Sequence, residues 1–249
     1  MNKLLLTGLI AATTTLSPFL ASTTAQAVTD VNQEEYEQQY QGVSDELLRL
    51  DYDTWKGFND LVNEEYNLLD VESLPTVDLS SLSWDHGASD VEVYFINEGA
   101  AHRNQLFLST DAGETKDIIF DDIASSLSIL NEDDGLLALG QGVSLGNFAH
   151  NTFLEFFLKP NGANDPNSQN YYGYDAANNF DNISHITGHQ VGEYILLGFE
   201  DMWAGGDFDY NDTVFVVKGV TTTPVPEPGM AVSLATLGIL GATLRKGKS

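Results

Sequence analysis

The sequence contains no cysteine. Disulfides, thiolate metal sites and a cysteine nucleophile are therefore excluded. Basic residues are also scarce, because 10 Lys and Arg stand against 37 Asp and Glu and the net charge is -27. Such a surface repels nucleic acid and anionic lipid and attracts divalent cations, so we expect no nucleic-acid partner. The chain is still 42% hydrophobic, which is enough to form a packed core.

Residues 1–27 have the pattern of a signal peptide. Lys3 supplies the positive start, and the stretch 4–20 is largely apolar and carries no charge. Ala25 and Ala27 then form a small-x-small cleavage pattern. We therefore expect signal peptidase to cut before Val28 and the protein to be exported.

The C-terminal region, residues 225–249, has three consecutive parts. Pro226, Glu227 and Pro228 come first, an apolar run over residues 230–244 follows, and a basic cluster ends the chain. The run has 15 residues, which is short of the ~17–25 of a comfortable membrane span. The basic cluster indicates the cytoplasmic side, so the body of the protein would lie outside the membrane.

This tripartite order resembles a PEP-CTERM sorting signal. The resemblance implies recognition by an exosortase, a transpeptidase-like membrane enzyme of Gram-negative bacteria. It also implies a transient inner-membrane intermediate held through residues 230–244, removal of the tail, and a final place at the cell surface, in the outer envelope or in the extracellular matrix. Proteins with this signal tend to accompany exopolysaccharide and biofilm. Without both ends, residues 28–227 carry a net charge of -31.

Residues 28–75 are expected to form an acidic helical arm. Apolar residues recur there at steps of three and four, which places them on one helix face: Trp55, Phe58, Val62, Tyr66 and Leu69. Asp53 is the expected N-cap. Leu74 and Pro75 end the helical part.

From residue 76 to residue 220, short runs rich in Val, Ile, Phe and Tyr alternate with Gly, Asn and Asp clusters. This pattern predicts about eight strands, at 77–83, 90–97, 104–109, 116–121, 142–147, 152–158, 190–199 and 212–219. The fold class expected is mainly β, an antiparallel β-sandwich of jelly-roll type with the helical arm before it. The Thr-rich residues 221–224 are expected to be a linker.

Residues 161–182 form one long polar stretch that predicts a loop. Loops of this length are uncommon unless they are functional or mobile. Tyr171, Tyr172 and Tyr174 lie in it. These rings either pack the loop onto the body or stack on a sugar.

Six oxygen-bearing residues gather within 13 positions near the end of the body, with no Lys or Arg among them: Glu200, Asp201, Asp207, Asp209, Asn211 and Asp212. Carboxylates so close repel one another, and each resists burial unless it is paired. Gly205 and Gly206 permit a turn that brings Glu200 or Asp201 back toward the others. Hard oxygen ligands suit calcium, so we expect calcium as the cofactor of these six residues.

Two other interpretations of the acidic residues remain open. They form either a solvated acidic hairpin or helix cap, or a catalytic pair. The spacing of Asp207, Asp209 and Asn211 copies the first ligands of an EF-hand loop, but Asp212 stands where that loop needs Gly and Lys218 where it needs Glu. An EF-hand is therefore excluded.

Residues 198–201, a short spacer and residues 207–212 before a Val-Phe-Val strand resemble the FED…DxDYND signature of a bacterial domain family of unknown function. The stretch 95–107 resembles the strand-turn-strand segment of the same family. The resemblance spans roughly residues 85–220. It implies that the six oxygen-bearing residues between positions 200 and 212 act together, and it implies no particular reaction.

These patterns predict an exported, exosortase-sorted surface or matrix protein with a calcium-stabilised β-sandwich, linked to exopolysaccharide or biofilm. The alternative is a secreted carbohydrate-binding module or a carbohydrate-active hydrolase that uses the acidic residues. A hydrolase needs two carboxylates across a cleft, one of them with a raised pKa. His185 and His189 have the spacing of a helical zinc pair, but the residues between them favour a turn. No HExxH motif occurs, so catalysis is the less favoured interpretation.

Overall fold

The computed structural model describes residues 31–44, 47–62, 68–84, 90–130 and 134–224. The predicted cleavage residues Ala25, Ala27 and Val28 lie outside these ranges. So do the sorting-signal residues Pro226, Glu227 and Pro228 and the apolar run 230–244. Within the described ranges, the helices are all too short and too polar to span a membrane.

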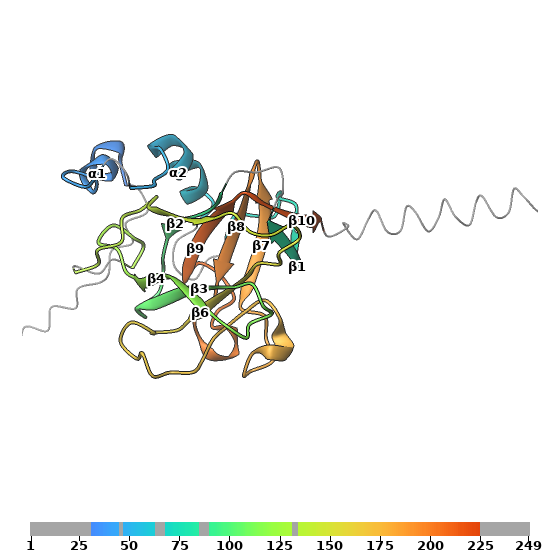
Figure 1. Cartoon of the computed structure of the whole chain (residues 1–249). Helices are drawn as coiled ribbons and strands as arrows, with labels where there is room; N and C mark the ends of the chain where they lie inside the picture. Colours follow the sequence, from blue (N-terminus) through green and yellow to red (C-terminus); the bar gives the residue numbers. More distant parts are fainter. Residues whose placement is uncertain (1–30, 45–46, 63–67, 85–89, 131–133, 225–249) are drawn as a thin grey trace, which may run out of the picture.

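The described strands form three antiparallel sheets (Figure 1). One sheet has the order β5-β2-β9-β8-β7, a second has the order β4-β3-β6, and β1 pairs with β10. The prediction of a mainly β, antiparallel fold with short N-terminal helices is confirmed. The strands are β1 (Val77–Trp84), β2 (Val91–Asn97), β3 (Asn104–Ser109), β4 (Asp117–Ile123), β5 (Gly142–Gly146), β6 (Glu155–Lys159), β7 (Ile186–Val191), β8 (Tyr194–Phe199), β9 (Thr213–Lys218) and β10 (Val220–Pro224).

The centre of the core is an aromatic cluster around Phe215 of β9. Its ring centroid lies 5.7 Å from that of Phe95 on β2 and 6.2 Å from that of Phe199 on β8. It also stacks on Phe120 of β4, with centroids 5.3 Å apart and an interplanar angle of 17°. Because β4 belongs to the three-stranded sheet, this contact joins the two larger sheets face to face. All four rings are buried.

Two short helices, α1 (Gln33–Gln38) and α2 (Tyr52–Asn59), make up the helical part of the arm. In Figure 1 they lie side by side, far from the long connection between β6 and β7. Trp55 is fully buried, stacks on Tyr36 at 4.8 Å and donates its indole N–H to the Ile96 carbonyl at 2.9 Å. Phe58 packs edge-on against Tyr194. Trp55 and Phe58 of the predicted apolar face therefore pack on the sandwich. The prediction that one helix carries the whole face was wrong, because α2 ends at Asn59 while Val62 and Leu69 are buried beyond it. Its member Tyr66 lies outside the described residues.

The predicted N-cap of α2 was wrong by two residues. Asp51 caps the helix, because its side chain accepts the backbone N–H of Thr54 at 3.0 Å. Asp53 lies in the first turn. The helix begins here because the preceding Leu50 donates its backbone N–H to the Gly140 carbonyl and so belongs to the extended chain.

Two predicted segments differ in the structure. The expected strand at 190–199 covers β8 and only the last two residues of β7, and a two-residue turn whose Gly192 has φ +60° joins the two strands. A two-residue hairpin turn needs positive φ, which Gly adopts without strain. The residues between His185 and His189, where a turn was expected, lie in β7, because they pair with β8. Residues 221–224 are not a linker, because they lie in β10 and pair with β1. Their β-branched side chains favour a strand.

Candidate metal centre

Residues 200–212, here called the acidic loop, connect β8 to β9. Glu200 directly follows β8, and Asp212 directly precedes β9. Because β8 and β9 pair side by side, the two ends of the loop are held together. The loop folds back over Gly198, where an added Cβ would lie only 2.5 Å from the Tyr210 carbonyl oxygen. A residue with a side chain at position 198 would push the loop away.

The backbone of the acidic loop is curled, not extended. Gly205 and Gly206 have φ of +76° and +53°, so the predicted glycine turn is present. Ala204, Phe208 and Tyr210 also have positive φ, between 58° and 64°. Each such non-glycine residue costs about 1–3 kcal/mol and persists only where its surroundings hold it.

Several hydrogen bonds hold this conformation. The Tyr210 N–H donates to Glu200 Oε1 at 2.7 Å, and the Phe208 N–H donates to the Gly205 carbonyl at 2.9 Å. From outside the loop, the Leu69 N–H donates to the Asp209 carbonyl at 3.2 Å. The loop is therefore fixed both internally and by the segment that follows α2.

The curled backbone brings three of the predicted ligands together. One carboxylate oxygen from each of Glu200, Asp207 and Asp209 lies within 4.8 Å of the other two. Glu200 and Asp209 are buried, and Asp207 is exposed. A single cation can therefore contact all three groups after small side-chain movements, and Asp207 gives the site an open side.

Glu200 has the most unusual surroundings of the three. Its side chain is fully buried, and Oε1 accepts the Tyr210 N–H. Oε2 is also buried and has no hydrogen-bond partner among the described residues. It faces the loop glycines, since an added Cβ on Gly206 would lie 2.5 Å from it. A buried carboxylate oxygen without a partner is costly unless a proton or a cation satisfies it.

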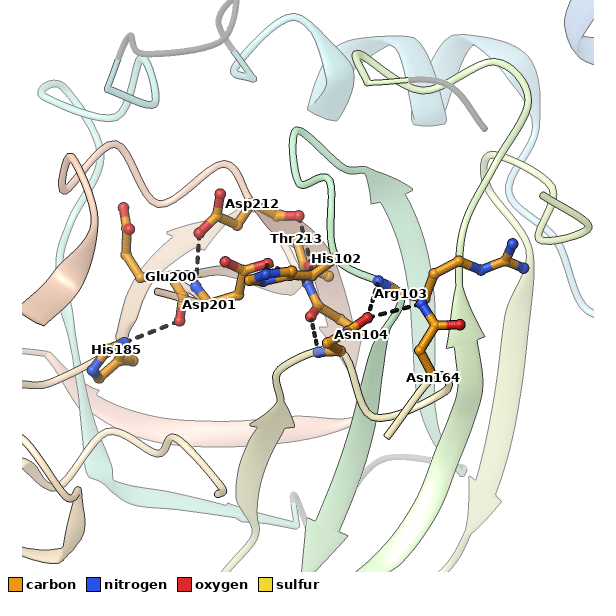
Figure 2. A network of polar contacts seen from close by, with 10 residues as sticks. His102, Arg103, Asn104, Asn164, His185, Glu200, Asp201, Asp212 and Thr213 are labelled. Carbon is orange, nitrogen blue, oxygen red and sulfur yellow. Dashed lines mark hydrogen bonds and ion pairs between the residues drawn. The ribbon is translucent and has the colours of Figure 1, made fainter. Parts of the chain in front are cut away.

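Asp201 and Asp212 point elsewhere (Figure 2). Asp201 Oδ2 accepts hydrogen bonds from Asn104 Nδ2 at 2.8 Å and from His102 at 3.1 Å. Asp212 Oδ2 accepts the backbone N–H of Asp201 at 2.7 Å. Asp201 ties the loop to the start of β3, and Asp212 joins the two ends of the loop. In Figure 2 the Glu200 carboxylate extends away from this network.

Asn211 also contributes through its backbone. Its carbonyl accepts the Gly99 N–H at 3.0 Å, and its own N–H donates to Asp209 Oδ1 at 3.1 Å. The second bond orients one of the three converging carboxylates. Of the six residues predicted to act together, the structure thus brings Glu200, Asp207 and Asp209 to one point and uses the others to shape the loop.

The sequence analysis missed the support beneath Glu200. His185 is fully buried, and its ring nitrogens lie 3.0 Å from the Glu200 carbonyl oxygen and 2.9 Å from Asp181 Oδ2. The same Asp181 oxygen accepts the Ala204 N–H at 2.8 Å. His185 does not pair with His189, whose ring instead contacts the Thr187 hydroxyl. The only sequence signal for this support was the pair of histidines itself, which suggested zinc.

Burial dominates the electrostatics of the loop. The pKa of Glu200 is raised to about 8, chiefly by burial. The Tyr210 N–H lowers this pKa, and the carboxylates of Asp209, Asp207 and Asp201 raise it. Burial and the neighbouring Asp201 also raise the pKa of Asp212. Without a cation, the carboxyl groups of the loop therefore resist full ionisation. A bound cation favours their ionised forms.

A cavity of about 430 Å³ opens beside the three carboxylates. Glu200 and Asp207 line it, together with His102 and Trp203. The Trp203 side chain is 64% exposed. The structure thus combines a group of converging oxygens with a neighbouring cavity.

The tyrosines of the loop 161–182 pack inward. Tyr172 is buried and stacks on His185 with ring centroids 3.7 Å apart. Tyr171 packs edge-on against Phe107, and Tyr174 packs against Phe153. The packing interpretation is therefore correct for Tyr172, and the other two rings are partly buried.

The likeness to known proteins is confined to this part of the chain. Residues 148–220 match the family model described as Domain of unknown function (DUF4114). The DUF4114 region includes β6 to β9, His185 and the acidic loop. It supports the predicted likeness to a domain of unknown function here, and the upstream stretch 85–147 lies outside the match. No curated protein and no solved structure gives a significant match to the chain.

The chemistry of the converging groups fits calcium. Carboxylate oxygens are hard ligands, which favour calcium and magnesium over zinc or copper. Magnesium demands near-ideal octahedral geometry at 2.0–2.1 Å, whereas calcium tolerates irregular ligand sets. A loop with one exposed and two buried carboxylates in a strained backbone suits the more tolerant ion.

Without calcium, the melting temperature should fall as the pH rises from 5 to 8. The folded-state pKa of Glu200 is about 8, above its ordinary value of 4.5. The folded protein therefore binds this proton more tightly, and the resulting stability is present below pH 4.5 and lost as the pH rises through 8. Even half of this pKa shift changes the free energy of unfolding by roughly 2–3 kcal/mol, which corresponds to about 4–12 °C in melting temperature for a protein of this size.

Thermal melts in chelator at several pH values measure this effect. Glu200→Gln should flatten the dependence, because the amide does not titrate. Equal slopes for the wild type and this variant would show that Glu200 is not the group responsible.

Proposed function

We propose that this chain is an exported surface or matrix protein whose DUF4114 region is stabilised by calcium bound to Glu200, Asp207 and Asp209. The single observation that carries the calcium site is the buried, unpartnered Oε2 of Glu200, which lies beside two further carboxylates. The strained loop adds support, because its conformation serves to bring these oxygens together. The high negative charge of the chain also favours divalent cations.

Calorimetric titration of the purified protein tests the site. We expect one calcium ion per chain with Kd on the order of 0.1–1 mM, the range of extracellular calcium modules. Binding should also release a proton near neutral pH, because Glu200 must ionise to bind the metal. The absence of a binding heat at millimolar calcium in several buffers, together with unchanged thermal stability, would refute the site.

A carbohydrate-active hydrolase is the second candidate. The observation that favours it is the cavity of about 430 Å³ beside a carboxyl group with a pKa near 8, since a general acid needs a raised pKa. However, the Glu200 side chain is fully buried, whereas a general acid must be accessible to the substrate that it protonates. We therefore place the hydrolase below the calcium site.

The destination of the protein belongs to the same proposal. The signal-peptide pattern of residues 1–27 supports export by way of signal peptidase. The PEP-CTERM-like tail, residues 225–249, supports sorting by an exosortase, with the inner membrane as an intermediate and the surface or matrix as the end point. Exopolysaccharide is the partner that this destination suggests.

The tail should be absent from the mature protein in a host that has an exosortase. The apolar run 230–244 has only 15 residues, which makes it a poor permanent anchor. Mass spectrometry of the surface-associated protein would identify its C-terminal peptide. We expect an end near Pro226–Pro228, and an intact end at Ser249 would contradict the sorting proposal.

A further inference from the structure

The calcium site proposed above has coordination positions to spare. Glu200 and Asp209 each have one oxygen that already accepts a backbone N–H. With Asp207, the three carboxylates have six oxygens, of which two accept these bonds, while calcium takes 6–8 ligands, so at least about two positions remain for other ligands. Glu200 and Asp207 both line the cavity of about 430 Å³. An oxygen-bearing ligand in this cavity can therefore fill the remaining positions.

The cavity also has apolar lining residues. Trp203 lines it with 64% of its side chain exposed, and the neighbouring Met202, also a lining residue, is 56% exposed. Trp203 and Met202 are adjacent in the chain and both line the cavity, so together they give it an exposed apolar side that a ligand can cover. The volume also falls within the usual range for small-ligand sites, about 300–1,000 Å³.

A ligand for this cavity needs two different faces. One face must present adjacent oxygens to a cation, and the other must be apolar enough to lie on an indole ring. A pyranose sugar has both, since two neighbouring hydroxyls supply paired oxygens and its C–H face packs on an aromatic ring. The high negative charge of the chain disfavours free anions, so a neutral sugar fits better than an acidic one.

We propose that the DUF4114 region binds a neutral sugar whose vicinal hydroxyls complete the coordination of calcium while its apolar face stacks on Trp203. This rests on the proposed calcium site and assigns a ligand class to it. The loop 161–182 is not the binding element, because its tyrosines pack against the body.

Saturation-transfer NMR tests the proposal on the purified protein. The probes are the methyl glycosides of mannose, galactose, glucose and fucose, each with saturating calcium and again with excess chelator. We expect transfer from the protein to at least one glycoside in calcium and none in chelator. Trp203→Ala should weaken this binding about ten-fold or more and leave the calorimetric calcium titration unchanged.

Phe180→Ala is the matched control. Phe180 is exposed to a similar degree, 61%, but lines a separate cavity with Tyr171. This variant should bind the sugar as the wild type does. Loss of binding in Phe180→Ala but not in Trp203→Ala would overturn the proposal, and so would binding that persists in chelator.

The two proposals fail in different ways. If calcium binds and no glycoside shows transfer, the sugar site is refuted and the calcium site stands. If the cavity instead takes an organic cation such as choline in chelator, the acidic groups act directly and the sugar site is refuted. If calcium does not bind at all, both proposals fall.

Discussion

Calcium at about 100 times its Kd should raise the melting temperature of the protein by about 5–11 °C. The folded loop holds Glu200, Asp207 and Asp209 together, and the unfolded chain does not, so binding favours the folded state by roughly 2.7 kcal/mol. In a protein of this size, that free energy corresponds to the stated shift. Differential scanning calorimetry with and without calcium measures it.

Any added salt screens the negative charge of the chain and also raises the melting temperature, so controls must separate this screening from calcium binding at the site. Magnesium at equal concentration should give a smaller shift, because its geometry is more demanding. Asp209→Asn should remove most of the calcium-specific shift. Asp121→Asn, at an exposed position on β4, removes the same charge away from the loop and should keep the shift. Equal shifts with both ions, or a full shift in Asp209→Asn, would contradict the account.

Trp55→Ala should lower the free energy of unfolding by about 3–5 kcal/mol, which corresponds to roughly 6–20 °C in melting temperature. The indole ring is fully buried, stacks on Tyr36 and donates to the Ile96 carbonyl at 2.9 Å. Its removal leaves a cavity between α2 and the sandwich and an unsatisfied carbonyl. Urea denaturation followed by circular dichroism measures the loss.

Trp55→Phe separates packing from hydrogen bonding. Phenylalanine keeps much of the buried ring and loses the indole N–H, so we expect a smaller loss of about 1–3 kcal/mol. A loss below about 0.5 kcal/mol in Trp55→Ala would show that the helices do not depend on this contact for their place on the sandwich.

The sequence predicts the fold well where a short apolar run ends at polar turn residues. The bounds of β2 and β3 match the prediction closely for this reason, and nearly every residue of both strands is buried, on both faces of the sheet. The predicted strand at 190–199 contains β8 and the turn at Gly192 but only the end of β7. Most of β7 was missed because its Thr, Gly and His residues form no apolar run. β10 was missed because Thr residues before a Pro-rich segment also suit a linker.

The candidate site was predicted less completely, for a physical reason. Spacing alone places Asp207 and Asp209 together, but their meeting with Glu200 depends on positive φ at Phe208 and Tyr210, which non-glycine residues rarely adopt. The partner of Asp201 is Asn104, 97 residues earlier in the chain. No local pattern encodes such a contact, because it depends on how β3 packs beside the acidic loop.

A crystal structure of the protein grown with millimolar calcium tests the central claim most directly. The account predicts one calcium ion at the acidic loop, with oxygens of Glu200, Asp207 and Asp209 at about 2.3–2.6 Å. Glu200 Oε2, which has no hydrogen-bond partner among the described residues, should be one of these ligands. Calcium bound elsewhere in the protein, with these three carboxylates left without a metal ion, would contradict the account.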